Sequence, residues 1–218
     1  MNEWIVIPAY NEERRIVFTL EETKKYAQNI IVIDDGSTDN TSRLIKTIPN
    51  VHSLQHIINL GKGSALKTGC DYAIKCGAKK IIVMDSDGQH DPAEIPTFVK
   101  LLETYDLVFG VRKRSKNMPL ILKFGNWFLN IWTRLLFKIK LDDTQSGYRA
   151  FTDHTYKLIR WQSSDYSVET EMIANLGRSK LKYTQIPIQT IYHDNYKGTT
   201  FLDGITIAFN MLVWRLRR

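Results

Sequence analysis

Two aspartates separated by one residue follow directly on a short apolar run. Residues 81–84 read Ile-Ile-Val-Met, and Asp85, Ser86, Asp87, Gly88 and Gln89 come next. Alternate residues at the end of a strand point the same way, so the two carboxylates could grip one divalent cation. Mg²⁺ and Mn²⁺ prefer such oxygen ligands and share their shell with phosphates. We therefore expect a metal site of Asp85, Asp87 and Gln89. A turn-forming role for the two aspartates is the alternative.

Polar residues also follow two other apolar runs. Asp34 and Asp35 come after residues 30–33 and could accept hydrogen bonds from a ribose or a base edge. A helix cap and turn are the alternative role for this motif. In residues 8–12, Tyr10 could pack on a nucleotide and Glu12 could bind its sugar. The segment 61–63, Gly-Lys-Gly, lacks the dinucleotide fingerprint and the Walker pattern, so we expect it to serve close helix packing.

The elements that must position these residues alternate between strands and helices. We expect strands over 4–7, where Pro8 stops the run, and over 30–33, 51–57, 80–84 and 107–109. Helices are expected over 11–28, 62–76 and 93–104, and a further one after Asp39. This alternation predicts an α/β fold with a mostly parallel sheet that has helices on both faces. Ligands of such sheets bind beyond the carboxyl ends of the strands, so the loops after Ile7, Ile33, Met84 and Phe109 should meet at one site.

The second half of the chain is less regular. It predicts helices over 120–138, 152–160, 168–177 and 201–216 and a strand over 182–192. With 218 residues, 43% of them hydrophobic, and no linker, the chain should form a single domain over 1–218. We expect 1–111 to bind a nucleotide and 112–218 to face an acceptor and a membrane. Two cysteines are too few for a disulfide framework and suggest a reducing compartment.

Positive charge is concentrated in one stretch of the chain. The net charge is +7, and residues 107–141 contain no acidic residue but eight basic ones: Arg112, Lys113, Arg114, Lys116, Lys123, Arg134, Lys138 and Lys140. Such a stretch attracts nucleic acid, anionic lipid or phosphorylated ligands.

The same part of the chain carries aromatic residues between its charges. Phe124, Trp127, Phe128, Trp132 and Phe137 lie within 120–138, and Trp214 lies beside three arginines in 201–218. Aromatic residues with basic flanks are typical of a helix in the membrane interface. The alternative is a core helix that covers the sheet. No segment has the 18 or so apolar residues of a transmembrane helix, and we see no secretory signal. We predict peripheral membrane binding through 120–138 and 201–218.

Five motifs together resemble one enzyme family. They are residues 7–13, IPAYNEE; 32–39, VIDDGSTD; 61–65, GKGSA; 84–90, MDSDGQH; and 143–149, DTQSGYR. In this order they resemble the family 2 glycosyltransferases of the GT-A fold, and within them the polyprenyl-phosphate sugar synthases, such as dolichyl-phosphate mannose or glucose synthase. The resemblance implies inverting transfer of a hexose from a nucleotide-diphosphate sugar, with Mg²⁺ or Mn²⁺ as cofactor.

The resemblance also assigns roles to individual positions. The residues implied to contact the nucleotide sugar are Pro8, Tyr10, Glu12, Ile33, Asp35, Asp85, Ser86, Asp87, Gln89, Arg112 and Lys197. Arg112, Ser146 and Arg149 are implied on the acceptor-phosphate side, and Asp87, Arg112 and Asp143 are the candidate catalytic residues. Two features depart from the family pattern. Ser86 stands where alanine is frequent, and an arginine usual before the late lysine has no clear counterpart.

The acceptor decides how much acid–base chemistry is needed. A hydroxyl acceptor requires a general base, whereas a lipid monophosphate, with its second pKa near 6, is largely dianionic at neutral pH. We therefore expect Asp143 to be structural or to orient the acceptor rather than to act as a base. A polyprenyl or dolichyl phosphate is our predicted acceptor, at the cytoplasmic face of a membrane. A membrane-anchoring partner or a homo-oligomer is a further possibility.

Three other functions stay open at this point. A glycosyltransferase that acts on a hydroxyl of a glycan or glycolipid is the nearest. A sugar-phosphate nucleotidylyltransferase also combines a nucleotide fold with metal carboxylates, but it releases pyrophosphate. A nucleic-acid-binding module would explain the basic stretch, yet it leaves the aspartate pairs at strand ends unexplained, so we expect no nucleic-acid partner.

Overall fold

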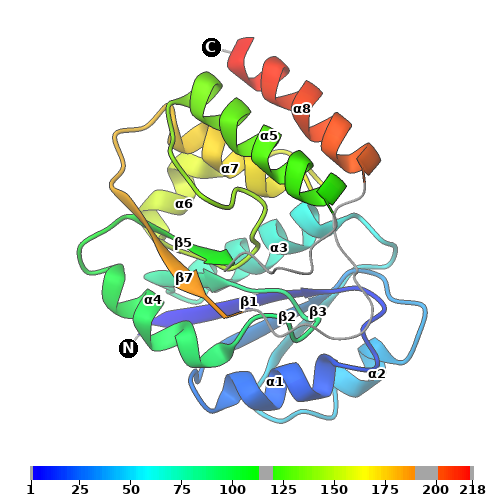
Figure 1. Ribbon diagram of the computed structural model, residues 1–218. Coiled ribbons are helices and arrows are strands. Elements are labelled where there is room, and N and C mark those ends of the chain that lie inside the picture. The colour runs from blue at the N-terminus through cyan, green and yellow to red at the C-terminus, as the bar shows by residue number, and fades with distance from the viewer. Residues whose placement is uncertain (1, 113–119, 190–200, 217–218) are drawn as a thin grey trace.

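A single sheet of seven strands forms the centre of the molecule (Figure 1). The computed structural model describes residues 2–112, 120–189 and 201–216. In the order of the sheet, the strands are β3 (His52–Gln55), β2 (Ile30–Asp34), β1 (Glu3–Ala9), β4 (Lys80–Val83), β6 (Arg149–Thr152), β5 (Leu107–Arg112) and β7 (Tyr183–Ile188). The first four are parallel to one another, whereas β6 is antiparallel to both of its neighbours.

The register of the parallel strands brings the predicted site residues to one edge. Ala9 of β1 pairs with Asp34 of β2, and Val6 of β1 pairs with Val83 of β4. The chain therefore leaves β1, β2 and β4 on the same side of the sheet. This confirms the expected α/β fold, and it places the loops after Ala9, Asp34 and Val83 together.

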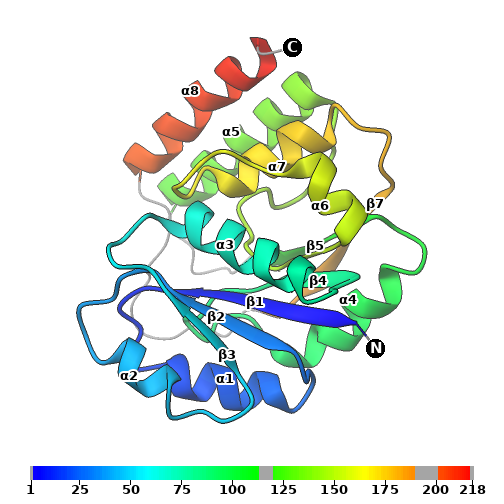
Figure 2. The ribbon, with the colours of Figure 1, turned by 180° about the vertical axis from the view of Figure 1, so that it is seen from behind.

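Helices cover both faces of the sheet (Figure 2). The helices α1 (Ile16–Lys24), α2 (Thr41–Ile45) and α4 (Ile95–Leu101) lie on one face, and α4 follows a 3-10 turn over Pro92–Glu94. The other face carries α3 (Lys62–Lys75), α5 (Leu120–Phe137), α6 (Asp153–Ile159), α7 (Val168–Leu176) and α8 (Phe201–Leu216). The central strands are apolar on both sides, because Ile33 packs with α3 while its neighbour Val32 packs with α1.

Several element boundaries, and one whole strand, differ from the sequence-based expectation. The first strand continues through Pro8 to Ala9, and the first helix begins only at Ile16, because Asn11 has a positive φ of 53° in the intervening loop. The strand β6 was not expected at all. It has only four residues and enters the sheet between β4 and β5 against their direction.

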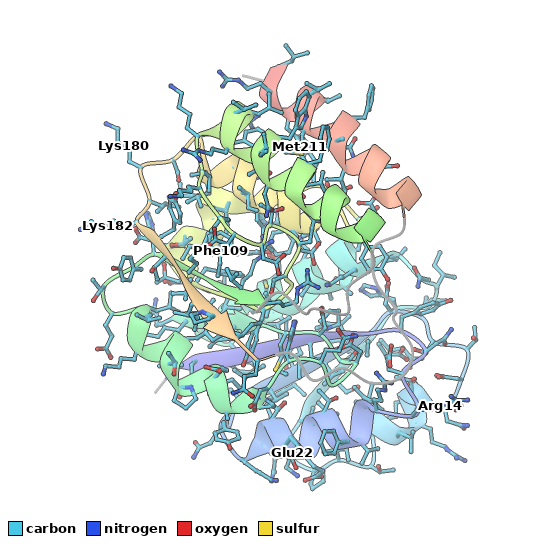
Figure 3. All side chains as sticks on the ribbon, in the orientation of Figure 1. Arg14, Glu22, Phe109, Lys180, Lys182 and Met211 are labelled. Atoms are coloured by element: carbon cyan, nitrogen blue, oxygen red, sulfur yellow. The ribbon has the colours of Figure 1, made fainter. Side chains whose placement is uncertain are left out.

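The outermost layer consists of α5 and α8, which lie side by side in both views (Figures 1 and 2). Figure 3 labels Met211 of α8 and Phe109 of β5, which both belong to the core cluster on this face of the sheet. Phe137 and Trp214 are also buried in that cluster, so the core-helix alternative is correct for these two aromatic residues. No helix among the described residues is long and apolar enough to span a bilayer. The side chains of Lys123, Phe124 and Trp127 lie outside the described ones.

The outward side of these two helices is nevertheless apolar. Among the described side chains, its exposed members are Phe128, Ile131, Leu135, Phe209, Leu212 and Leu216. Exposed basic residues flank them, namely Arg134, Lys138, Lys140 and Arg215. We call the six apolar residues the apolar face. Exposed apolar patches rimmed by polar residues are typical of interaction surfaces.

Glycines fix the start of α3 against the chain segment 161–166. Gly63 donates its N–H to the carbonyl of Ser164 at 2.7 Å, and its own carbonyl accepts from Trp161 Nε1 at 2.7 Å. A Cβ atom at position 63 would lie 2.2 Å from the carbonyl oxygen of Ser163. The expected role of Gly61–Gly63 in close packing is confirmed, since the amides of Gly63 and Ser64 already point at a protein carbonyl.

This contact predicts a loss of stability for Gly63→Ala. The clash is with main chain, which cannot rotate away, so the free energy of unfolding should fall by about 1–3 kcal/mol. Chemical denaturation monitored by circular dichroism measures it. Ser64→Ala, one position further along α3, is the matched control and should change the free energy of unfolding by less than about 0.5 kcal/mol. Equal effects of the two substitutions would contradict the packing role.

Candidate active site

A cleft of about 620 Å³ opens at the carboxyl edge of β1, β2 and β4. The loops after β1, β2 and β4 form one part of its wall. The start of α3 with the residues before it, and the segment before α7, form the rest. The lining residues are Pro8, Ala9, Tyr10, Asn11, Glu12, Asp35, Asn59, Gly61, Lys62, Ala65, Asp85, Ser86, Asp87, Asp165 and Tyr166. Seven predicted nucleotide-sugar positions therefore lie around one space: Pro8, Tyr10, Glu12, Asp35, Asp85, Ser86 and Asp87.

The carboxylate of Asp85 is the most strongly paired group of the cleft. Its Oδ1 lies 2.6 Å from Nζ of Lys62, and the same ammonium lies 2.8 Å from Oε1 of Glu169. Burial alone would raise the pKa of Asp85, but the charge of Lys62 lowers it to about 2. The main-chain N–H of Asp85 donates to Nδ1 of His90 at 3.0 Å. Asp85 is thus ionised and held in place, and His90 supports its main chain.

Asp87 has the opposite electrostatic environment. Burial and the nearby charge of Asp85 raise its pKa above the ordinary value. Its Oδ1 accepts a hydrogen bond from the main-chain N–H of Gln89 at 3.0 Å. Two carboxylates that face one cleft therefore repel each other, and a divalent cation between them would remove the repulsion.

The surroundings of these oxygens leave room for an ion. Gly147 lies opposite Asp85, and a Cβ atom there would come within 2.8 and 2.9 Å of the two Asp85 carboxylate oxygens. Hard oxygen donors, a side-chain-free neighbour and an open cleft fit Mg²⁺ or Mn²⁺. In the part of the chain that the structure describes, no three His, Cys, Asp or Glu side chains gather as a metal cage. Asp85 and Asp87 are the two carboxylates that would hold such an ion. Gln89 is adjacent, and its role as a third ligand stays a prediction.

The part of the cleft wall formed by the loop after β2 is built around Asp35. This buried carboxylate accepts from the main-chain N–H groups of Leu60 and Gly61, at 3.0 and 2.8 Å, and lies 2.7 Å from Nδ1 of His56. Asp35 therefore also fixes the loop over 56–61, in addition to facing the cleft. Ile33 is fully buried in the core, so its side chain does not reach the cleft. Tyr10, in contrast, is 44% exposed at the rim.

The predicted acceptor motif contains a charged pair. Oδ2 of Asp143 lies 2.7 Å from Nε of Arg112, and Oδ1 lies 3.1 Å from an Nη of the same arginine. Burial would raise the pKa of Asp143, but Arg112 and the N–H of Gln145 hold it below the ordinary value. Ser146 is buried nearby, and its Oγ accepts from the N–H of Tyr148 at 3.4 Å. An ionised, tightly paired carboxylate is a weak base, so Asp143 is suited to orienting Arg112.

Arg149 occupies a different place from the one expected. Its side chain is 1% exposed, and its guanidinium donates to the carbonyls of Thr144, Ser146 and Glu169 at 2.5–3.0 Å. Burial lowers its pKa to about 10. Arg149 therefore ties the loop over 143–149 to α7 from inside the protein. A direct contact with an acceptor phosphate does not fit this buried position. The spacing of the motif gave no hint that its last residue turns inward.

Several residues of the site were missed by sequence reasoning. Lys62 was considered only as part of a packing motif, and Asp165 and Tyr166 of the far wall carry no recognisable pattern. From the sequence, Glu169 and Glu171 would each be expected to pair with a buried arginine, and this expectation is wrong for Glu171. Its carboxylate instead accepts from the N–H groups of Gln162 and Ser163. Glu169 pairs with Lys62 and offers its carbonyl to Arg149. Lys197 lies outside the described residues.

Comparison with known proteins decides the family. The model of the glycosyl transferase family 2 matches residues 4–166, which include the cleft and the acceptor motif. The chain belongs to glycosyl transferase family 2. It is a glycosyltransferase, which decides against the nucleotidylyltransferase and nucleic-acid-binding alternatives.

Relatives of this family 2 glycosyltransferase have named activities. A UDP-N-acetylglucosamine–dolichyl-phosphate N-acetylglucosaminyltransferase of Methanococcus voltae is 32% identical, over 98% of this chain and 96% of the relative. An undecaprenyl-phosphate mannosyltransferase of Micrococcus luteus is 28% identical, over 84% of this chain and 81% of the relative.

A solved structure confirms the GT-A-type architecture of this family 2 enzyme. Glucosyl-3-phosphoglycerate synthase of Mycobacterium tuberculosis, in complex with Mn²⁺, UDP and glucosyl-3-phosphoglycerate, superimposes with a TM-score of 0.71 at 18% identity. The match covers 99% of this chain and 78% of the other. At this identity the similarity shows the fold.

The environment of Asp87 predicts opposite effects on metal binding and stability for Asp87→Asn. Removal of the charge should weaken Mn²⁺ binding by at least about tenfold, because a carboxylate ligand is lost. The melting temperature should stay the same or rise, since an aspartate whose pKa is raised on folding is destabilising when ionised. Electron paramagnetic resonance of free Mn²⁺ and differential scanning calorimetry measure the two effects.

The matched control is Glu103→Gln, which removes one exposed carboxylate outside the cleft. It should leave both quantities near their wild-type values. Unchanged Mn²⁺ affinity in Asp87→Asn would contradict the assigned ligand, and a large fall in its melting temperature would contradict the electrostatic account.

Proposed function

We propose that this enzyme transfers a hexose from a nucleotide-diphosphate sugar to a polyprenyl or dolichyl phosphate at a membrane surface, with inversion at the anomeric carbon. The observation that carries the acceptor assignment is the pairing of Asp143 with Arg112. A carboxylate whose pKa is held low by an arginine is a poor acceptor for the proton of a hydroxyl. A phosphate acceptor needs no such base, because it is already an anion.

In the proposed reaction an oxygen of the acceptor phosphate attacks the anomeric carbon of the sugar. The bond from that carbon to the diphosphate oxygen breaks, and the nucleoside diphosphate leaves with the bonding electrons. Asp85 and Asp87 would hold the Mg²⁺ or Mn²⁺ that stabilises the charge of the leaving diphosphate. Tyr10, Glu12 and Asp35 line the part of the cleft that we assign to the nucleotide. Arg112, oriented by Asp143, is assigned to phosphate, as is Lys197.

The relatives support the choice of acceptor. Their names join different sugars, N-acetylglucosamine and mannose, to the same acceptor class, a polyprenyl phosphate. The apolar face of α5 and α8 supports it as well, because a lipid acceptor stays in the bilayer while the cleft works at its surface. We place the enzyme peripherally, at the cytoplasmic face.

The proposal predicts a labelled lipid product. The chain is incubated with polyprenyl phosphate, Mn²⁺ or Mg²⁺, and radiolabelled UDP-glucose, GDP-mannose or UDP-N-acetylglucosamine in separate reactions. One donor should give a labelled lipid that is absent with EDTA. Binding of a donor without any labelled lipid would overturn the acceptor assignment.

Asp143→Asn separates the two acceptor chemistries in the same assay. Transfer to a phosphate should continue at a reduced but measurable rate, since only the orientation of Arg112 is disturbed. Complete loss of turnover, with both substrates still bound, would show that Asp143 is a general base. A hydroxyl acceptor would then be favoured.

The apolar face predicts reversible binding to anionic vesicles. Leu135 and Phe209 are 68% and 66% exposed, so Leu135→Glu combined with Phe209→Glu should abolish co-sedimentation without unfolding the chain. Phe18→Glu is the matched control, because Phe18 is 55% exposed on α1 at the opposite face of the sheet. Binding should also weaken as salt increases. Absence of wild-type binding at low salt, or an equal loss in the Phe18 variant, would contradict the proposal.

A further inference from the structure

The ammonium of Lys62 lies beside a carboxylate that we assign to the divalent cation. Its ammonium lies 2.6 Å from Asp85 Oδ1 and 2.8 Å from Glu169 Oε1, and its side chain is 16% exposed at the wall of the cleft. Asp85 is also one of the two carboxylates assigned to the divalent cation. One ligand of the metal is therefore already paired with a fixed positive charge of the protein.

The structure around Lys62 holds this ammonium in place. Lys62 is the first residue of α3, and the neighbouring Gly61 and Gly63 dock that end of the helix on residues 163–165. A Cβ atom at Gly147 would lie 2.9 Å from Nζ of Lys62, so the acceptor loop is also fitted around the ammonium. Glu169, the second partner of Lys62, is itself tied into α7, whose carbonyl at position 169 accepts from Arg149.

The positive charge of Lys62 has opposite effects on the binding of a divalent cation and of a nucleotide diphosphate. A positive charge beside Asp85 repels a free divalent cation and cancels part of the attraction of the carboxylates. The same charge attracts the diphosphate of a nucleotide. When the diphosphate is present, its own negative charges restore the attraction for the metal. The cation and the nucleoside diphosphate then favour each other by the same factor.

We propose that Lys62 is a positioning residue that makes metal binding depend on the nucleoside diphosphate. Without a nucleotide in the cleft, the ammonium keeps the affinity for a divalent cation low. Glu169 shares the ammonium of Lys62 and so determines how strongly that ammonium pairs with Asp85. This inference rests on the proposed metal site of the transferase. It adds a role that the family resemblance does not assign to this lysine.

The test measures Mn²⁺ binding by electron paramagnetic resonance, without nucleotide and with UDP or GDP in separate titrations. The wild type should bind Mn²⁺ weakly alone and much more tightly with one of the two nucleotides. Lys62→Met should bind Mn²⁺ alone at least about tenfold more tightly than the wild type. Its gain in affinity on addition of the nucleotide should fall by at least about tenfold.

Lys75→Met is the matched control. It removes the same charge from the exposed C-terminal end of α3, about 20 Å from Lys62 at 1.5 Å per residue, and it should change neither quantity. A melting curve verifies that each variant is folded. Unchanged or weaker binding of free Mn²⁺ by a folded Lys62→Met would overturn the proposal.

Glu169→Gln provides a second variant with the opposite sign. Loss of this carboxylate leaves Lys62 paired with Asp85 alone, so free Mn²⁺ should bind more weakly than to the wild type. Unchanged or tighter binding would count against the proposal. If the wild type binds no Mn²⁺ with either nucleotide, the metal site of the proposed function fails. If the wild type binds Mn²⁺ and Lys62→Met behaves like it, only the role of Lys62 fails.

Discussion

Two partly buried carboxylates that follow a buried strand repel each other, and much of this molecule serves to hold them there. The ion pair between Lys62 and Asp85, at 2.6 Å, is the contact on which the surrounding structure depends. It needs the start of α3 to dock closely on residues 163–165, which the glycines on both sides of Lys62 allow. It also needs Glu169 of α7, which shares the ammonium.

A second buried charge connects this centre to the acceptor side. Arg149 is buried beside the loop over 143–149 and donates to the carbonyls of Thr144, Ser146 and Glu169, so it ties this loop to α7. The same loop carries Asp143, which orients Arg112, and Gly147, which approaches Asp85. The two carboxylates and the proposed acceptor groups are thus parts of one connected structure, although their residues come from the loop after β4, from β5 and from the segment before β6.

The sequence predicted the parts of this structure that depend on local patterns. Apolar runs identified the parallel strands, and strand ends with polar residues located the cleft, because parallel strands must end at the same edge. The roles of Lys62, Glu169 and Arg149 could not be predicted. Lys62 and Glu169 pair although they lie far apart in the sequence, and Arg149 binds main-chain carbonyls, which no side-chain pattern reveals. The short strand β6 was missed for the same reason. Aromatic spacing also failed to separate the buried Trp214 from the exposed Phe209 of the same helix.

The central claim is that Asp85 and Asp87 bind the donor diphosphate through a divalent cation. A crystal structure with Mn²⁺ and a nucleoside diphosphate, analysed by anomalous diffraction, tests it most directly. The account predicts an anomalous peak in contact with a carboxylate oxygen of Asp87 and with the diphosphate, beside Gly147. A nucleotide bound in the cleft with no metal between it and these carboxylates would contradict the account, and so would a nucleotide bound elsewhere.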